Sequence, residues 1–253
     1  MDDEVVYASR LADLAASISV PRFRQQDFSV TTKPDGSPVT DVDVAIETAL
    51  RASLARDRPG DMVTGEELGD TGPAARRWYL DPIDGTKRFI AGDPAWMTLI
   101  ALAVDDRLVL GIVDFPALGE RWWAVRGRGA FHDGRRLRVS TRARLADATV
   151  GDTWRGDLAA SNRAHPIYAV AERCAEARPN RGHSFLAVAC GEAEIAVSVG
   201  SFAWDYAPLK LLVEEAGGRF TDFDGSDRID THTAVATNGP LHAEVLELLR
   251  NAR

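Results

Sequence analysis

The chain has very few cysteines and no long apolar run. Of its 253 residues only Cys174 and Cys190 are cysteines, so at most one disulfide can form and a disulfide framework is excluded. No apolar stretch approaches the roughly 20 residues that a membrane-spanning helix needs. The acidic segment MDDEVVYASR lacks the basic start and apolar core of a secretion signal. We therefore expect a soluble, cytoplasmic protein with no membrane partner.

An excess of positive charge is also absent. The formal net charge is −8, whereas general nucleic-acid binding needs a basic surface that displaces counterions. We therefore expect no nucleic-acid partner. A small phosphorylated metabolite is not excluded, because bound metal ions can bring positive charge to an acidic site. An acidic protein that handles phosphate is expected to use metal.

The chain does have clear hydrophobic periods, which change near residue 145. Apolar residues at helical spacing predict a first helix that stops at Pro21 and a second from Asp43 to Arg58, with a loop at residues 31–41 between them. Strand patterns follow, including a hairpin of residues 97–104 and 108–114. The first half, residues 1–144, is therefore predicted to be α+β.

Short strands and helices alternate in the second half, residues 145–253, which is predicted to be α/β. The expected strands are residues 193–199, 219–222 and 234–237, and the expected helices are residues 206–216 and 241–249. The first of these helices should be closed by Gly217-Gly218. No linker of low complexity separates the halves, so the predicted class is α/β with two parts that pack closely around a cleft.

The segment LDPIDGT places two carboxylates at the end of a predicted strand. Pro82 has no N–H for a sheet, so we expect the chain to leave the sheet just after Asp81. Asp84 can turn back to the same point, and Gly85 and Thr86 open a turn or helix whose N–H groups can hold an anion. This arrangement suits metal and phosphate. The alternative is a solvated turn, which a DxxDG string alone would favour.

Three further acidic residues have two possible roles each. Glu66 and Glu67 follow a predicted buried strand end, so one of them can point inward, although paired glutamates are usually surface charge. Asp205 stands just ahead of an apolar helix. It either caps that helix and does nothing more, or caps it through one oxygen and binds metal through the other.

Taken together, these motifs resemble one known family. The order GEE, DPIDGT, and WD before an apolar helix ending in EAGG is similar to the inositol monophosphatase family of Mg²⁺-dependent, typically lithium-sensitive phosphatases. The resemblance runs from Lys33 to AVATNGPLH and looks strongest to the bacterial histidinol-phosphatase branch, through KPD, SPVTD, GIV, RWWA and RGRGAF. It implies a layered αβαβα sandwich of the sugar-phosphatase type and a homodimer.

The resemblance also implies a set of magnesium ligands. Carried over by position, Glu66, Asp81 and the carbonyl of Ile83 would hold one Mg²⁺, while Asp81, Asp84 and Asp205 would hold a second. A looser third ion would sit near Glu66, giving two to three ions in the site. All of these ligands are oxygens, which suits Mg²⁺.

The implied reaction is attack of a metal-activated water on phosphorus, in line with the leaving oxygen. By the same resemblance, Glu66 and the hydroxyl of Thr86 orient this water, and Asp43 is linked to Thr86. The N–H groups of Gly85 and Thr86 face the phosphate, and Asp205 also lies on the substrate side.

The sequence departs from the family on the substrate side. Arg88 replaces a common Asn, and it either favours an anionic substrate or forms a surface ion pair. Residues 90–93 lack the Arg-Gly of the histidinol-phosphatase branch. Ser198 stands where many members have Glu, and the segment ending in His183 and Ser184 is slightly shortened. These four side chains, Arg88, His183, Ser184 and Ser198, are candidate substrate contacts.

The predicted function is hydrolysis of a small phosphomonoester, with L-histidinol phosphate as the first candidate. Inositol phosphate and nucleotide or sugar phosphates are the enzymatic alternatives, including a step of a specialised biosynthetic pathway. A non-catalytic metal- or phosphate-binding protein is the alternative from another class. The retained Thr86 argues against it, because a protein without turnover has no need of that hydroxyl.

Overall fold

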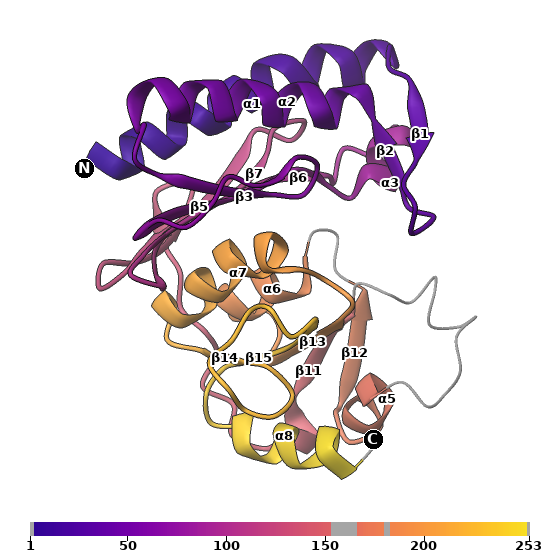
Figure 1. The fold of residues 1–253 in the computed structure, drawn as a ribbon. Coiled ribbons are helices and arrows are strands. Elements are labelled where there is room, and N and C mark those ends of the chain that lie inside the picture. The colour runs from indigo at the N-terminus through magenta and orange to yellow at the C-terminus, as the bar shows by residue number, and fades with distance from the viewer. Residues whose placement is uncertain (1–2, 153–165, 180–182, 252–253) are drawn as a thin grey trace. The chain divides into compact units, whose positions relative to one another are not determined.

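The computed structural model describes residues 3–152, 166–179 and 183–251. The chain divides into two compact units, residues 1–126 and 127–253 (Figure 1). The boundary expected from the sequence, between residues 144 and 145, stays a prediction. Among the described residues, no helix combines the length and the apolar character needed to cross a bilayer.

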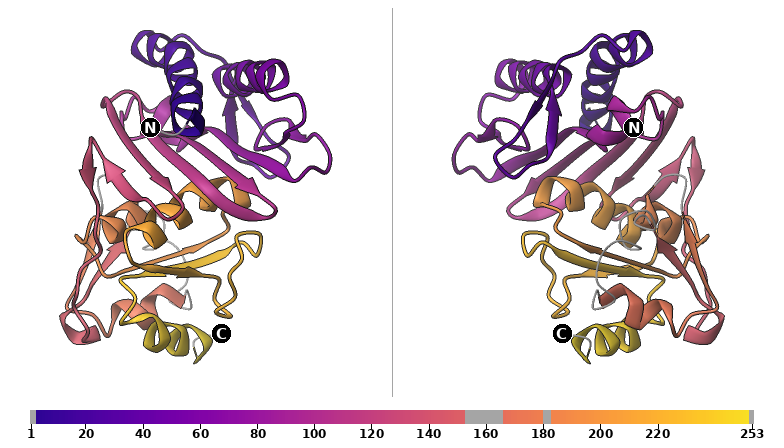
Figure 2. Two further views of the ribbon diagram at one scale, coloured as in Figure 1. Left: turned by 90° about the vertical axis from the view of Figure 1, so that its left-hand side faces the viewer. Right: turned by 90° about the vertical axis from the view of Figure 1, so that its right-hand side faces the viewer.

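Unit 1 consists of two long helices packed side by side on one face of a sheet (Figures 1 and 2). The two long helices are α1 (Asp3–Gln25) and α2 (Asp41–Asp57). A short helix, α3 (Thr86–Ile90), follows the strand β5 (Arg76–Asp84). The strands of this sheet that belong to unit 1 run in the order β8-β7-β6-β5-β3-β4. Their bounds are β3 (Met62–Gly65), β4 (Gly69–Asp70), β5 (Arg76–Asp84), β6 (Met97–Val104), β7 (Arg107–Phe115) and β8 (Glu120–Val125). Most neighbours pair antiparallel, while β3 and β5 are parallel.

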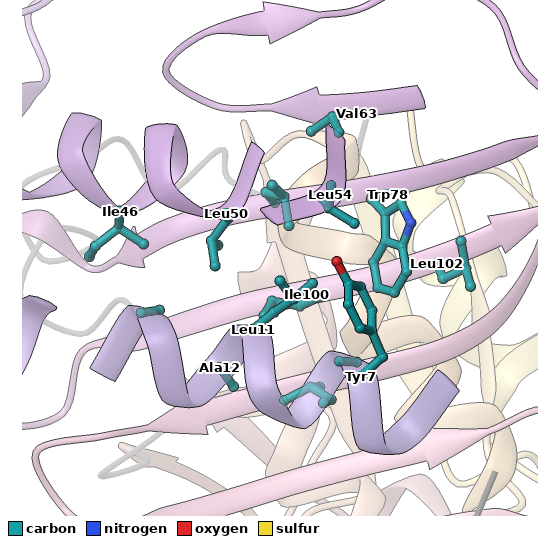
Figure 3. Close-up of a cluster of buried hydrophobic side chains, with 14 of the residues drawn as sticks. Tyr7, Leu11, Ala12, Ile46, Leu50, Leu54, Val63, Trp78, Ile100 and Leu102 are labelled. Carbon is teal, nitrogen blue, oxygen red and sulfur yellow. The ribbon is translucent and has the colours of Figure 1, made fainter. Parts of the chain in front are cut away.

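The core of unit 1 lies between these helices and the sheet (Figure 3). Leu11 of α1, Ile46 and Leu50 of α2, Trp78 of β5 and Ile100 of β6 are each at most 1% exposed. Burial of one such side chain contributes on the order of 1.5–3 kcal/mol. This packing fixes α2 on β5, and these two elements carry Asp43, Asp81, Ile83 and Asp84 of the candidate site.

The helix α1 does not stop at Pro21, as the sequence predicted, but continues to Gln25. Proline lacks the N–H for one helical hydrogen bond, and tertiary contacts compensate for this loss. The ring of Phe23 packs on Phe89 and Trp96, with centroids 5.4 and 5.6 Å apart. These contacts hold the last turn in place.

The predicted loop at residues 31–41 is instead a small hairpin of β1 (Val30–Thr32) and β2 (Pro38–Thr40). It leads directly into α2, which begins at Asp41 and not at Asp43. Thr40 is the N-cap, and its N–H donates to Asp43 Oδ2 over 2.9 Å. The hydroxyl of Thr40 accepts from the N–H of Asp43 at 3.4 Å. This reciprocal capping box places Asp43 inside the first turn.

Unit 2 is a five-stranded sheet with helices on both faces (Figure 1). The strand order is β12-β11-β13-β15-β14, parallel across β12-β11-β13 and antiparallel across β13-β15-β14. The strands are β11 (Thr149–Asp152), β12 (Glu176–Pro179), β13 (Ile195–Val199), β14 (Arg219–Thr221) and β15 (Thr233–Thr237). One face carries α6 (Ser184–Ala189) and α7 (Ala203–Glu215), and the other carries α5 (Pro166–Ala171) and α8 (His242–Asn251).

Two small elements precede this sheet in the sequence. They are a hairpin of β9 (Gly129–His132) and β10 (Arg135–Arg136), and a 3-10 turn, η1 (Leu145–Asp147). The predicted α+β first half and α/β second half are confirmed.

A buried histidine joins α8 to the sheet of unit 2. His242 is 1% exposed, with Nε2 2.9 Å from Thr221 Oγ1 and Nδ1 3.1 Å from Thr237 Oγ1. Burial lowers the pKa of His242 to about 4, and the positive charges of Arg219 and Lys210 act in the same direction. The ring is therefore neutral at pH 7.

The lowered pKa of His242 makes the stability of the protein fall with acidification. The pKa of His242 in the folded protein, about 4, lies below the ordinary value of 6.5. The contribution of neutral His242 to the free energy of unfolding is therefore complete above pH 6.5 and is lost as the pH falls towards 4. Between pH 7 and 5 the loss should be about 2 kcal/mol. Chemical denaturation at both pH values would measure it against His242→Gln. The stability advantage of the natural protein should shrink by that amount at pH 5, and a constant advantage would contradict the assignment.

Candidate active site

The DPIDGT segment forms the end of β5 and the start of α3. The strand β5 pairs with β6 at Asp81 and again at Asp84, with a β-bulge between them. The prediction that Pro82 ends the strand is therefore wrong. Pro82 lies within the bulge, where the strand needs no N–H from it for pairing with β6. The carbonyl of Pro82 accepts a 2.8 Å hydrogen bond from Thr98 Oγ1. A bulge re-aims the residues around it, here the two aspartates.

The turn after Asp84 depends on a glycine. Gly85 has φ 87° and ψ 42°, a left-handed conformation that favours glycine, and it is the N-cap of α3. The next residue, Thr86, has its Oγ1 3.2 Å from the carbonyl oxygen of Ile83 and 3.4 Å from Asp43 Oδ1. The structure thus brings Asp43 of α2 and Thr86 of α3 together, as the resemblance implies.

The carboxylates of this region carry excess negative charge. The pKa of Asp84 is raised to about 6, first by loss of hydration and then by the charge of Glu66, while Arg88 opposes the shift. Burial likewise raises the pKa of Asp43 to about 6, against hydrogen bonds from Thr40 and with a further contribution from Glu66. A cation bound among these groups would relieve the repulsion.

Glu66 and Glu67 lie in the turn between β3 and β4, and both meet Lys33. The ammonium of Lys33 is 2.7 Å from Glu66 Oε1 and 2.8 Å from Glu67 Oε1. The side chain of Glu67 is 6% exposed against 24% for Glu66. Burial raises the pKa of Glu67 to about 7, although Lys33 opposes the shift. Glu67 is thus the more buried of the two, which the sequence could not decide.

The donor chemistry of unit 1 fits Mg²⁺. Asp81 is 2% exposed, and with Glu66, Asp84 and the carbonyl of Ile83 it offers only oxygen ligands. The ammonium of Lys33 shows that a cation is stabilised beside Glu66. Within residues 3–152, 166–179 and 183–251, however, no three His, Cys, Asp or Glu side chains are grouped closely enough to hold a metal ion.

In unit 2, Asp205 lies in the first turn of α7. Its Oδ2 accepts a 2.7 Å hydrogen bond from the N–H of Phe202, which is the N-cap residue. Asp205 therefore caps the helix from inside its first turn. Ser198 on β13 is 5% exposed, and its Oγ accepts from the hydroxyl of Tyr206 at 3.1 Å and lies 3.4 Å from Ser201 Oγ.

The other candidate substrate contacts have structural partners. His183 is the N-cap of α6, with Nδ1 3.4 Å from the N–H of Phe185 and the two rings stacked at 5.3 Å. Ser184 follows it and is 1% exposed. In unit 1, Arg88 donates to the carbonyl of Ala95 over 3.2 Å and forms no salt bridge with a described residue. The surface ion pair expected for Arg88 is therefore not formed there.

Sequence reasoning missed Glu47, which is fully buried on α2. Its carboxylate accepts hydrogen bonds from the N–H groups of Glu67 and Leu68. A signal was present, because Glu47 follows Asp43 by four residues and so shares a face of the helix with it.

Similar solved structures define the class of protein. An inositol monophosphatase from Zymomonas mobilis aligns with a TM-score of 0.82 and 30% identity, and the alignment covers 98% of each chain. The expected layered fold is therefore confirmed. This likeness, together with the relatives below, makes the chain a phosphomonoesterase.

The family model described as "Inositol monophosphatase family" matches residues 1–253. The chain belongs to the inositol monophosphatase family. A histidinol-phosphatase of Mycobacterium tuberculosis is 43% identical, with 98% of each chain covered. An inositol-1-monophosphatase of Mesorhizobium japonicum is 32% identical, with 89% of this chain and 87% of the relative covered.

Proposed function

We propose that the protein hydrolyses L-histidinol phosphate in the presence of Mg²⁺, releasing L-histidinol and inorganic phosphate. The observation that carries this proposal is the 43% identity to a histidinol-phosphatase over 98% of both chains. The oxygen-rich, negatively charged region around β5 and α2 supports the need for a divalent cation.

In the proposed site, the ions would be held by five oxygen-bearing groups. The ligands would be Glu66, Asp81, the carbonyl of Ile83, Asp84 and Asp205. Two to three Mg²⁺, when bound, supply neutralisation of phosphate charge and a water of lowered pKa.

The remaining steps belong to groups of the chain itself. Thr86 Oγ1 carries one proton, which in the proposed site it would donate to Asp43 Oδ1 and not to the carbonyl of Ile83. Its lone pairs would then accept from the attacking water. Glu66 would orient the same water and take up its proton. The N–H groups of Gly85 and Thr86, at the start of α3, would bind phosphate oxygens while the bond to the leaving oxygen breaks. The leaving oxygen takes a proton from solvent.

A second candidate substrate is an inositol monophosphate. Histidinol carries a cationic amine, which a carboxylate would bind well. At the position where many relatives have Glu, this chain has Ser198, whose hydroxyl is bonded to Tyr206. A substrate without an amine has no need of a carboxylate there, and one relative is an inositol-1-monophosphatase.

Phosphate release from a substrate panel tests the proposal. The panel comprises L-histidinol phosphate, myo-inositol 1-phosphate and adenosine 3′,5′-bisphosphate, each with Mg²⁺ and with EDTA. We expect kcat/KM for histidinol phosphate to exceed the others by about tenfold or more, and activity to vanish in EDTA. Preference for the inositol ester would favour the second candidate. No release from any ester would reject the enzyme and favour a non-catalytic binding protein.

A cytoplasmic homodimer is part of the same proposal. Both cysteines, Cys174 and Cys190, are free thiols, which agrees with a reducing compartment. The resemblance to the family supports the dimer, and sedimentation of the purified protein would measure it.

A further inference from the structure

A buried carboxylate behind the Glu66 turn is the centre of a dense set of contacts. Glu47, on α2, is 0% exposed. Its Oε2 accepts a 2.7 Å hydrogen bond from the N–H of Glu67, and its Oε1 accepts a 3.1 Å bond from the N–H of Leu68. Both donors belong to the turn between β3 and β4. A buried carboxylate without such partners would be costly, so the turn and the carboxylate stabilise each other.

Arg51 completes this arrangement one helical turn further along α2. Its Nε lies 2.8 Å and its Nη2 2.7 Å from Glu47 Oε1. The Nη2 group also donates to the carbonyl of Gly69, at the far end of the same turn. The pair formed by Glu47 and Arg51 therefore binds two N–H groups and one carbonyl of residues 65–69, and the opposite charges compensate each other.

Gly65 shows how closely the turn approaches the carboxylate. A Cβ added at Gly65 would lie 2.1 Å from Glu47 Oε1 and 2.5 Å from Glu47 Cδ. Such a contact is impossible without displacement. Gly65 is therefore needed for space, because the backbone of the turn packs directly on the Glu47 carboxylate.

The turn held in this way carries Glu66. The N–H of Glu66 donates to the carbonyl of Leu80 over 3.1 Å, so β5 fixes its backbone from one side and Glu47 fixes the following residues from the other. The charge of Glu66 acts on both Asp43 and Asp84. Any shift of the turn would move this charge relative to the two aspartates.

We propose that Glu47 is a positioning residue, which holds the turn of residues 65–69 so that Glu66 can bind Mg²⁺. This inference rests on the proposed function, in which Glu66 is a ligand. Asp43 and Glu47 lie one turn apart on α2, so a single helix then aligns Thr86 through Asp43 and Glu66 through Glu47. Glu47 itself touches neither substrate nor metal.

Two substitutions disturb the contact from opposite sides. Glu47→Gln keeps the volume but replaces one acceptor oxygen with an NH₂ group, which cannot accept from the turn or from Arg51. Gly65→Ala keeps the carboxylate but pushes the turn away from it. The matched controls are Glu247→Gln, at an exposed glutamate of α8, and Gly60→Ala, where an added Cβ meets nothing within 4 Å.

The test is calorimetric titration with MgCl₂ in the absence of substrate, followed by phosphate release as a function of Mg²⁺. Both variants should bind Mg²⁺ about 10- to 100-fold more weakly, with KM for the phosphate ester unchanged at saturating Mg²⁺. The controls should bind as the natural protein does. Natural Mg²⁺ affinity in Glu47→Gln would overturn the inference. If that variant does not fold, natural affinity in Gly65→Ala would overturn it instead. A natural protein that binds Mg²⁺ but hydrolyses no ester would contradict the proposed function alone.

Discussion

Asp84→Asn is expected to lower kcat by about 10³-fold or more, because it removes a negative charge from the proposed second ion. Asp84 follows the bulge of β5, and loss of hydration together with Glu66 raises its pKa to about 6. Its ionised form is therefore disfavoured by the fold in the absence of metal. A neutral side chain of the same size should leave the melting temperature without Mg²⁺ unchanged or higher.

Phosphate release at saturating Mg²⁺ and thermal unfolding together measure this prediction. Asp70→Asn is the matched control, since Asp70 is an exposed aspartate of β4 in the same sheet. It should turn over at the natural rate. Natural turnover in Asp84→Asn would refute the assignment of Asp84 as a ligand, and a large fall in its melting temperature would assign it a structural role.

Asp205→Asn is the second substitution with a large expected effect. Asp205 Oδ2 accepts from the N–H of Phe202, and the side-chain oxygen of asparagine can accept the same bond, so α7 should keep its cap. The negative charge is lost, and we expect kcat to fall by about 10²-fold or more. The variant therefore separates capping from metal binding.

The comparison with Asp205→Ala sharpens this result. Alanine removes both the charge and the acceptor, so it should also lower the free energy of unfolding by about 1 kcal/mol. The asparagine variant should be as stable as the natural protein. If Asp205 only caps α7, the asparagine variant will keep its turnover, measured as phosphate release at saturating Mg²⁺.

Elements set by local chemistry were predictable from the sequence. The hairpin of β6 and β7 turns at Asp105 and Asp106, which have φ of 49° and 58°, and aspartate tolerates this left-handed region. The helix α7 ends at Glu215, and Gly217 follows with φ 95°. In both places a few adjacent residues determine the backbone, so the pattern is sufficient.

Elements set by distant partners were not predictable in the same way. The course of β5 past Pro82 depends on its register with β6 and on the hydroxyl of Thr98. The last turn of α1 after Pro21 depends on the rings of Phe89 and Trp96. A hydrophobic period contains no information about such contacts, because the partners lie far away in the sequence.

The candidate site also has features that the sequence could predict and features that it could not. The resemblance identified Asp43 and Thr86 as a pair, and the structure places their side-chain oxygens 3.4 Å apart. The resemblance could not indicate that Glu67 is more buried than Glu66, or that Glu47 holds the turn that carries both. Those facts depend on how α2 packs on the sheet. Only the three-dimensional arrangement shows them.

Our central proposal is that Asp81, Asp84 and Asp205 bind the same divalent cations. A crystal structure of the protein with Mg²⁺ and phosphate tests it most directly. We expect one carboxylate oxygen of Asp205 at about 2.1 Å from an ion that also binds Asp81 and Asp84. An ion held by Asp81 and Asp84 while Asp205 bonds only to the N–H of Phe202 would contradict the claim.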